Sequence, residues 1–140
     1  MILLICEEIN TAYNTKDLEY LEDLFGGDRL VLDMVVQQDS VKQIKGGKNI
    51  MKNLRRFFSR GEQPNFRMSE IEVSQSKRRA SIYGITFKFE CRSKYYSDDG
   101  YMFLLVELRD DEKPVVHVCA WHHGYPLDKD KIYSLEDFDF

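Results

Sequence analysis

The stretch that decides the fold class is residues 82–123, IYGITFKFECRSKYYSDDGYMFLLVELRDDEKPVVHVCAWHH. Three runs of β-forming residues follow one another here, separated by two polar connections. From Ile85 to Arg92 apolar and polar residues alternate, which is typical of a strand with one face in water. Asp99 and Gly100 are typical of a tight turn before the second run. The stretch therefore predicts three consecutive antiparallel strands.

The second and third runs, residues 101–108 and 115–121, are apolar at nearly every position. A strand that is apolar on both faces must be covered on both. Helices of the same chain can cover one face, whereas the other needs the C-terminal tail or a second subunit. We predict a homodimer formed through the sheet face. We also expect one domain, residues 1–124, with a tail, residues 125–140, that packs on it.

The helices that the sequence predicts all precede this sheet. Apolar residues recur every three or four positions in residues 2–13, 18–25 and 48–60. Asn14 or Thr15 is placed to cap the second helix. Residues 30–36 and 66–74 read as further strands, with a short hairpin arm between residues 37 and 47. Helices followed by an antiparallel sheet indicate the α+β class.

Size and charge exclude several classes of function. A chain of 140 residues fits one domain. Its net charge of −4 favours neither nucleic acid nor an anionic membrane surface as a partner. The apolar start, residues 1–5, lacks the features of a signal peptide. Because that start is abrupt, a leader removed from an exported protein is also compatible with it, and the localisation stays undetermined.

The three cysteines, Cys6, Cys91 and Cys119, form no CxxC pair, and we interpret them as small core residues. The spacing of His117 and Cys119 on one strand would place both side chains on the same face, as in a pair of zinc or copper ligands. No third ligand follows from the spacing. We therefore expect no metal and no cofactor.

Several segments resemble the superfamily of nuclear transport factor 2 (NTF2). The order of elements and residues 12–25, AYNTKDLEYLEDLF, are similar to its opening helices. Residues 97–105 (SDDGYMFLL), 116–121 (VHVCAW) and 133–138 (YSLEDF) resemble uncharacterised bacterial members. The resemblance implies an NTF2-like, or SnoaL-like, cone in which N-terminal helices pack on a curved antiparallel β-sheet. It also implies a tendency to dimerise, and it implies no activity.

Among the enzymes of that superfamily, the ketosteroid isomerases offer a direct comparison. Asp33 falls at the position of their general base. Thr11 and Leu105 fall where those enzymes place an oxyanion-binding tyrosine and a protonated aspartate. An enolate needs hydrogen-bond donors where its charge develops. With two of the three groups missing, steroid-isomerase chemistry is not expected.

Asp33 and His117 are the candidate catalytic residues. An apolar strand disfavours the charged form of Asp33, which suits a general base. The alternatives are an aspartate that is hydrogen-bonded to a neighbouring loop or exposed on an edge, and a sheet-face histidine bonded to a tyrosine or carboxylate.

Aromatic and histidine side chains gather near the ends of the predicted strands and suit a pocket for a small apolar or aromatic ligand. They suit a dimer interface or core rim equally well. The candidate ligand-binding residues are Tyr13, Tyr95, Tyr101, Trp121 and His123.

The sequence thus leaves two functions open. One is a non-catalytic module that binds a small ligand or a protein partner. The other is a small-molecule isomerase, lyase or hydrolase that uses Asp33 or His117.

Overall fold

The computed structural model describes residues 2–25, 32–37, 40–45, 47–59, 65–92, 97–108, 114–123 and 135. Its elements in chain order are α1 (Ile2–Thr15), α2 (Leu18–Phe25), β1 (Leu32–Gln37), β2 (Ser40–Lys45), α3 (Gly47–Phe58), β3 (Asn65–Gln75), β4 (Ile82–Arg92), β5 (Ser97–Glu107) and β6 (Val115–His123). The three predicted helices and the strand-rich second half are confirmed, and with them the α+β class.

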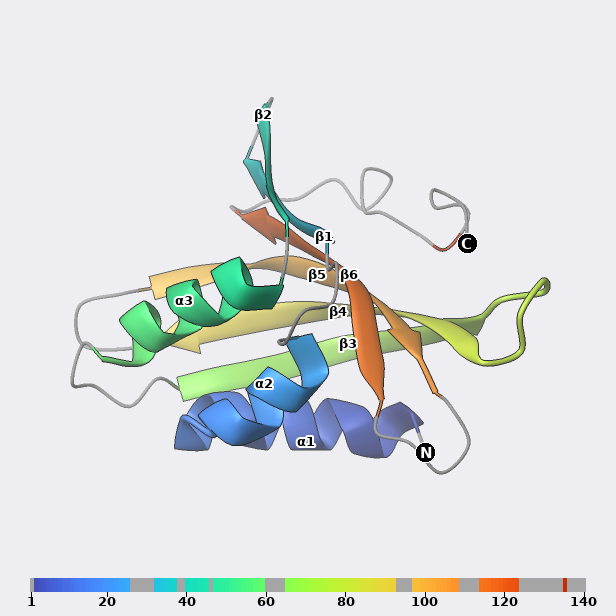
Figure 1. Ribbon diagram of the computed structural model, residues 1–140, viewed down its shortest axis with the longest axis horizontal. Coiled ribbons are helices and arrows are strands. Elements are labelled where there is room, and N and C mark those ends of the chain that lie inside the picture. The colour runs from blue at the N-terminus through green and yellow to red at the C-terminus, as the bar shows by residue number, and fades with distance from the viewer. Residues whose placement is uncertain are drawn as a thin grey trace.

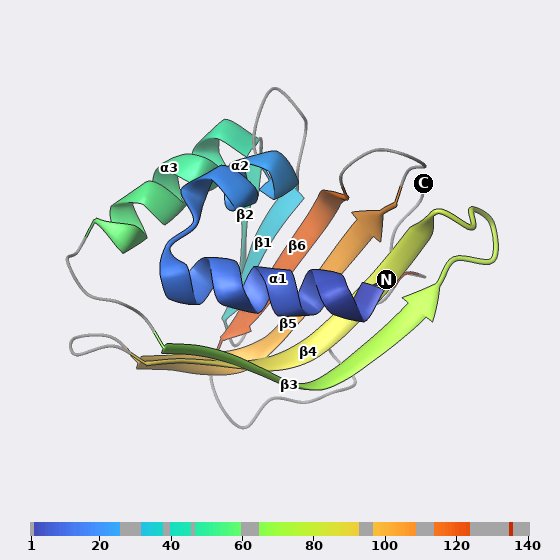
Figure 2. The same cartoon turned by 90° about the horizontal axis from the view of Figure 1, so that it is seen from below.

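All three helices lie on one side of a single curved sheet (Figures 1 and 2). Each buries the apolar stripe that its sequence predicts. In α1, for example, Ile5, Ile9 and Ala12 are buried. In α3, Arg55 and Arg56 are exposed as expected, and Arg55 forms a surface ion pair of 2.8 Å with Glu22 of α2. Pairs of this kind contribute little to stability, so packing against the sheet holds the helices in place.

The joint between α1 and α2 differs from the expected one. Lys16 adopts a left-handed backbone conformation with φ 56°, and the second helix starts two residues later, at Leu18. The cap is Asp17, whose Oδ1 accepts a hydrogen bond of 3.1 Å from the backbone N–H of Tyr20. The prediction that Asn14 or Thr15 caps α2 is therefore wrong, because α1 continues through both residues.

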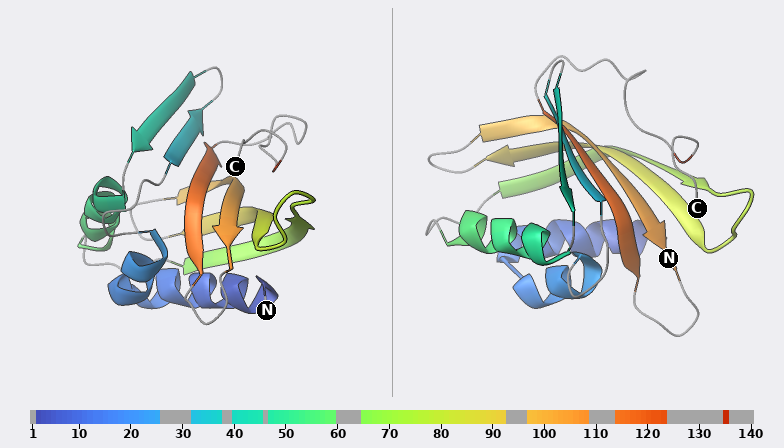
Figure 3. Two further views of the ribbon diagram at one scale, coloured as in Figure 1. Left: turned by 45° about the vertical axis from the view of Figure 1, so that its right-hand side comes forward. Right: turned by 45° about the horizontal axis from the view of Figure 1, so that its top comes forward.

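The sheet has the strand order β2-β1-β6-β5-β4-β3. Neighbouring strands pair antiparallel except β1 and β6, which are parallel. The predicted hairpin arm is confirmed as β2, which pairs with β1 from Leu32↔Lys45 to Gln37↔Ser40. The sheet curves around the helices, and β3 and β2 form its two edges (Figure 3).

The expected turn at Asp99 and Gly100 is wrong, because β5 begins at Ser97 and includes both residues. Gly100 pairs with Phe89 on one side and with His123 on the other. The polar start of β5 is bonded to the end of β4 by Arg92, whose guanidinium donates to the carbonyl of Asp98 at 3.0 Å and lies 3.5 Å from the Asp99 carboxylate.

Both faces of the sheet carry an apolar cluster. The larger cluster lies between the sheet and the helices and includes Ile85, Phe87 and Leu104. We call this the helix side. The second cluster lies on the opposite face, the outer face, and consists of Ile82, Phe103, Leu105, Val118, Ala120 and Leu135. Leu135 is the described residue of the predicted tail, and the remainder of that tail lies outside the described residues.

Helix α1 is joined to edge strand β3 by one side chain. The Asn14 amide donates to the Phe66 carbonyl at 2.8 Å, and its Oδ1 accepts from the Phe66 N–H at 2.6 Å. Tyr13 stacks on the Phe66 ring with centroids 4.6 Å apart. The amide thus takes the place of a neighbouring strand at this position. We refer to these two hydrogen bonds as the Asn14 clamp.

Replacing Asn14 tests the clamp. Asn14→Ala leaves both backbone groups of Phe66 without these partners, so we expect the free energy of unfolding to fall by about 1 to 2 kcal/mol. Urea denaturation measures the change. Asn65→Ala, at the exposed start of the same strand, is the matched control and should stay within about 0.5 kcal/mol of the parent. Equal losses in the two variants would contradict the clamp.

Gly84 lies directly against Leu135 on the outer face, so a substitution there tests how Leu135 packs. A Cβ at this position would lie 2.8 Å from Leu135 Cγ, 3.0 Å from Ser74 Oγ and 3.1 Å from Phe103 Cε2. Gly84→Ala should therefore destabilise the protein by about 1 to 3 kcal/mol through overpacking. In a Leu135→Ala background the penalty should be smaller, because the nearest atom is removed. A double-mutant cycle measured by thermal denaturation checks this, and equal penalties in both backgrounds would contradict the contact.

Candidate functional site

Asp33 lies in a register row that belongs to the helix side of the sheet. Its Cα partner in β6 is Cys119, which in turn pairs with Leu104 and then Ile85. These three partners are buried in the helix-side cluster. Asp33 thus occupies a register row whose partners Cys119, Leu104 and Ile85 are all apolar.

His117 lies at a β-bulge, and the bulge decides its face. Leu105 pairs with Val118 and Val106 pairs with Val116, so His117 is an extra residue in β6. Val116 packs in the helix-side cluster and Val118 in the outer one. A strand loses its strict alternation at a bulge, which allows His117 to share the outer face with its neighbour Val118.

The side chain of His117 bonds to a buried carboxylate. Its Nε2 lies 2.8 Å from Oε1 of Glu107, a residue that is 6% exposed and pairs with Ile82 on the outer face. Arg79 of the β3–β4 turn lies 3.4 Å from the other Glu107 oxygen. The interpretation of His117 as a histidine bonded to a carboxylate is confirmed. The expected common face of His117 and Cys119 is wrong, because the bulge lies between them and Cys119 packs on the helix side.

The aromatic candidates do not form one described cluster. Tyr13 is buried between Phe66 and Phe58, with ring centroids 4.6 and 6.1 Å away, and belongs to the helix-side core. Tyr101, by contrast, precedes helix-side Met102 in β5, and its hydroxyl lies 3.4 Å from Glu70 Oε2. The two tyrosines therefore lie on opposite faces of the sheet.

Two of the other three ligand-binding candidates lie in the last part of β6. Trp121 is the register partner of Met102 and Val35, and His123 that of Gly100 and Gln37. Tyr95 lies outside the described residues. A ligand-binding role for the five candidates stays a prediction.

The cysteines are buried and free, which confirms their interpretation as core residues. Burial raises the pKa of the Cys91 thiol to about 11 and also raises that of Cys6. Both are therefore neutral near pH 7 and are poor nucleophiles. In the described part of the chain, no three histidine, cysteine or acidic side chains gather closely enough to hold a metal ion. No helix among the described residues is long and apolar enough to cross a membrane.

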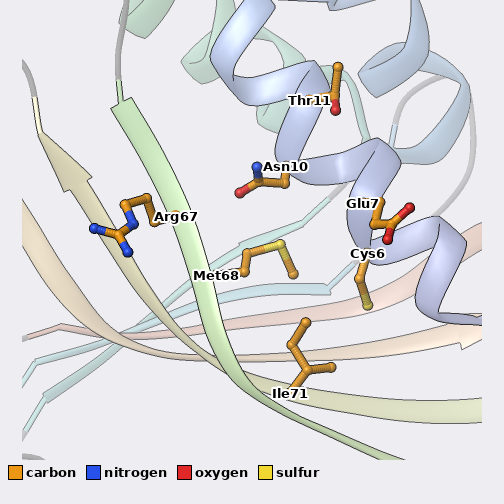
Figure 4. Close-up of a pocket in the computed structure, with 7 residues that line it drawn as sticks. All are labelled: Cys6, Glu7, Asn10, Thr11, Arg67, Met68 and Ile71. Atoms are coloured by element: carbon orange, nitrogen blue, oxygen red, sulfur yellow. The ribbon is translucent and has the colours of Figure 1, made fainter.

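Sequence reasoning missed a groove between α1 and β3. It has a volume of about 520 Å³ and is open to solvent. It is lined by Cys6, Glu7, Asn10, Thr11, Arg67, Met68 and Ile71, which Figure 4 shows as sticks. The signal in the sequence was the pair Asn10 and Asn14, which stand one helical turn apart among the apolar residues of α1.

No family model and no curated protein matches this chain in sequence. Similarity appears at the level of solved structures. The beta subunit of benzoate 1,2-dioxygenase from Burkholderia mallei is 12% identical, with a TM-score of 0.70 over 94% of this chain and 95% of that one.

Two further structures carry the family's name. A proposed dehydratase of the NTF2-like family from Streptomyces avermitilis is 10% identical, with a TM-score of 0.68 over 89% of this chain and 95% of that one. An NTF2-like protein of unknown function from Pseudomonas putida is 13% identical, with a TM-score of 0.66 over 99% and 93% of the two chains. Helices packed on one face of a curved sheet, together with these matches over almost the whole chain, show that this protein has the NTF2-like fold.

Proposed function

We propose that this chain is a non-catalytic NTF2-like module for binding or assembly. The observation that carries the proposal is the placement of the two candidate acid/base residues. Asp33 lies in a helix-side register row, whereas His117 bonds to Glu107 on the outer face. General acid–base catalysis needs its groups within hydrogen-bond reach of one substrate. A substrate held inside the cone would meet at most one of the two.

The contacts of His117 also favour a structural role. Glu107 is the buried charged residue of the described core, and a buried charge needs partners. His117 and Arg79 supply them on its two oxygens, at 2.8 and 3.4 Å. The imidazole of His117 thus helps to stabilise a buried carboxylate.

Two considerations support assembly over catalysis. The neighbour with a TM-score of 0.70 is the beta subunit of a dioxygenase, so an NTF2-like chain of this length serves there as one subunit of a larger enzyme. The outer face of this chain also carries an apolar cluster, and its members Phe103, Leu105 and Val118 are already buried within the single chain. Leu135 covers the part of that face near Gly84. We propose that the outer face, with Leu135 as part of it, pairs two copies of the chain.

The alternative function is a small-molecule isomerase, lyase or hydrolase that uses Asp33 alone. The position of Asp33 in a helix-side row and the proposed dehydratase among the neighbours favour it. It requires that a ligand reach the helix side of the sheet and be turned over there.

The dimer is tested by light scattering of the purified protein at micromolar concentrations. We expect twice the chain mass of 16.6 kDa. Thr86 is half-buried and pairs with outer-face Phe103, so Thr86→Arg should place a charge in the interface and give a monomer. Thr11→Arg, exposed on α1, is the control and should remain dimeric. A parent protein that is monomeric at these concentrations would overturn this proposal.

Binding without turnover is tested by a thermal-shift screen against small metabolites, steroids, lipids and divalent metals. A compound that binds only the native state raises the melting temperature. Each hit is then incubated with the protein and followed by NMR. We expect no consumption, and we expect Asp33→Asn to bind the hit about as well as the parent. Consumption by the parent that Asp33→Asn abolishes would establish the enzyme alternative.

A further inference from the structure

The groove between α1 and β3 is bounded by a helix on one side and by the free edge of a sheet on the other (Figure 1). The two elements run in opposite directions and lie side by side in both views (Figures 1 and 2). The Asn14 clamp fixes them together at Phe66. Further along β3, the groove opens next to Asn10, Met68 and Ile71.

Met68 repeats the backbone geometry of Phe66. Backbone N–H and C=O groups point to alternate sides along an antiparallel strand, so those of Met68 face the same free edge as those of Phe66. Two strand residues span about 6.6 Å. One step back along the helix, from Asn14 to Asn10, spans about 6 Å. The spacing would therefore allow Asn10 to repeat the clamp at Met68.

That second clamp does not form. The Asn10 Oδ1 atom is buried and has no hydrogen-bond partner in the described part of the chain. No described side chain bonds the backbone of Met68 either. A buried acceptor without a partner costs free energy. The groove is thus bordered by a donor and an acceptor of the strand backbone, and the Asn10 side chain in its lining carries a buried acceptor without a partner in the described part of the chain.

The floor of the groove is apolar. In Figure 4, Met68 and Ile71 point from the strand toward Cys6 of α1, while Asn10 lies between helix and strand. Ile71 is 38% exposed although it is a large apolar residue. A β-bulge between Ser69 and Glu72, with Glu70 at φ 51°, interrupts the regular strand beside it. The groove is therefore polar along the free backbone edge of β3 and apolar on its floor.

We propose that this groove binds an extended peptide segment, which adds to the free edge of β3 and places an apolar side chain against Cys6, Met68 and Ile71. A peptide main chain carries a donor and an acceptor at the spacing of the strand edge, and a further N–H can bond Asn10. A steroid or an acyl chain would fill the floor but leave these polar groups unpaired. The site goes beyond the proposed assembly through the outer face, and either proposal can fail without the other.

The probe is a blocked pentapeptide, acetyl-Val-Thr-Val-Thr-Val-amide, titrated into the full chain labelled with nitrogen-15. We expect amide shifts confined to β3 around Met68 and to the side-chain amide of Asn10. The control is the same peptide N-methylated at all five residues, so that none of its five backbone nitrogens can donate to the strand edge. It should bind at least about fivefold more weakly, the loss expected for one or two hydrogen bonds.

Three variants complete the test. Asn10→Ala removes the unsatisfied acceptor, so it should not lower the melting temperature, while it weakens peptide binding about fivefold. Ile71→Lys, at an exposed position, should also weaken binding and leave the fold intact. Asn65→Ala, outside the groove, should bind as the parent does.

Several outcomes would overturn the proposal. The first is that the N-methylated peptide binds as tightly as the parent peptide, which would indicate a site for apolar small molecules. The second is that the amide shifts are confined to β2, at the other edge of the sheet. The third is no binding at millimolar peptide. Pairing of two β3 edges in the free protein would also overturn it, and would appear as a dimer that Ile71→Lys dissociates and Thr86→Arg does not.

Discussion

Burial of β5 on both faces is the constraint on which the rest of the structure depends. Every residue from Tyr101 to Glu107 is buried, and β5 lies between β4 and β6 inside the sheet. Such a strand has no side on which to leave a polar group in water. Helices cover one face, and Leu135 packs in the apolar cluster on the other. Glu107, at the end of this strand, is consequently a buried charge that must be compensated.

Compensation of Glu107 links the core to the candidate site. The bulge in β6 brings His117 to the outer face, where its ring reaches the carboxylate at 2.8 Å. Without the extra residue, strict alternation would place His117 and Val118 on opposite faces. The same irregularity that satisfies Glu107 therefore separates His117 from the helix-side row of Asp33. A structural requirement of the core thus removes one candidate catalytic residue from the cone.

Regular patterns made most of the fold predictable. The three helices followed from apolar periodicity, and the alternation from Ile85 to Arg92 identified β4. The wrong predictions concern positions where a single residue interrupts the regular pattern. Asp99 and Gly100 look like a turn, but Arg92 bonds the polar start of β5 to β4 and extends the strand through them. The bulge at His117 leaves no mark in the sequence, because valines flank the histidine on both sides. The candidate site was less predictable than the fold, since the face of each residue depends on such irregularities.

Helix α1 protects edge strand β3 at Phe66 but not at Met68. An exposed edge invites unwanted pairing, and proteins protect it with bulges, charges or a covering element. Here Asn14 pairs with the backbone of Phe66, and the bulge at Glu70 interrupts the strand further on. At Met68, between these two positions, neither a side-chain hydrogen bond nor a bulge protects the edge, and the Oδ1 atom of Asn10 is buried without a partner among the described residues. Placing an asparagine where an apolar residue would pack better lowers stability, and sites that bind a partner commonly carry such a cost. We therefore attribute the free edge at Met68 to the proposed peptide partner and not to the needs of folding.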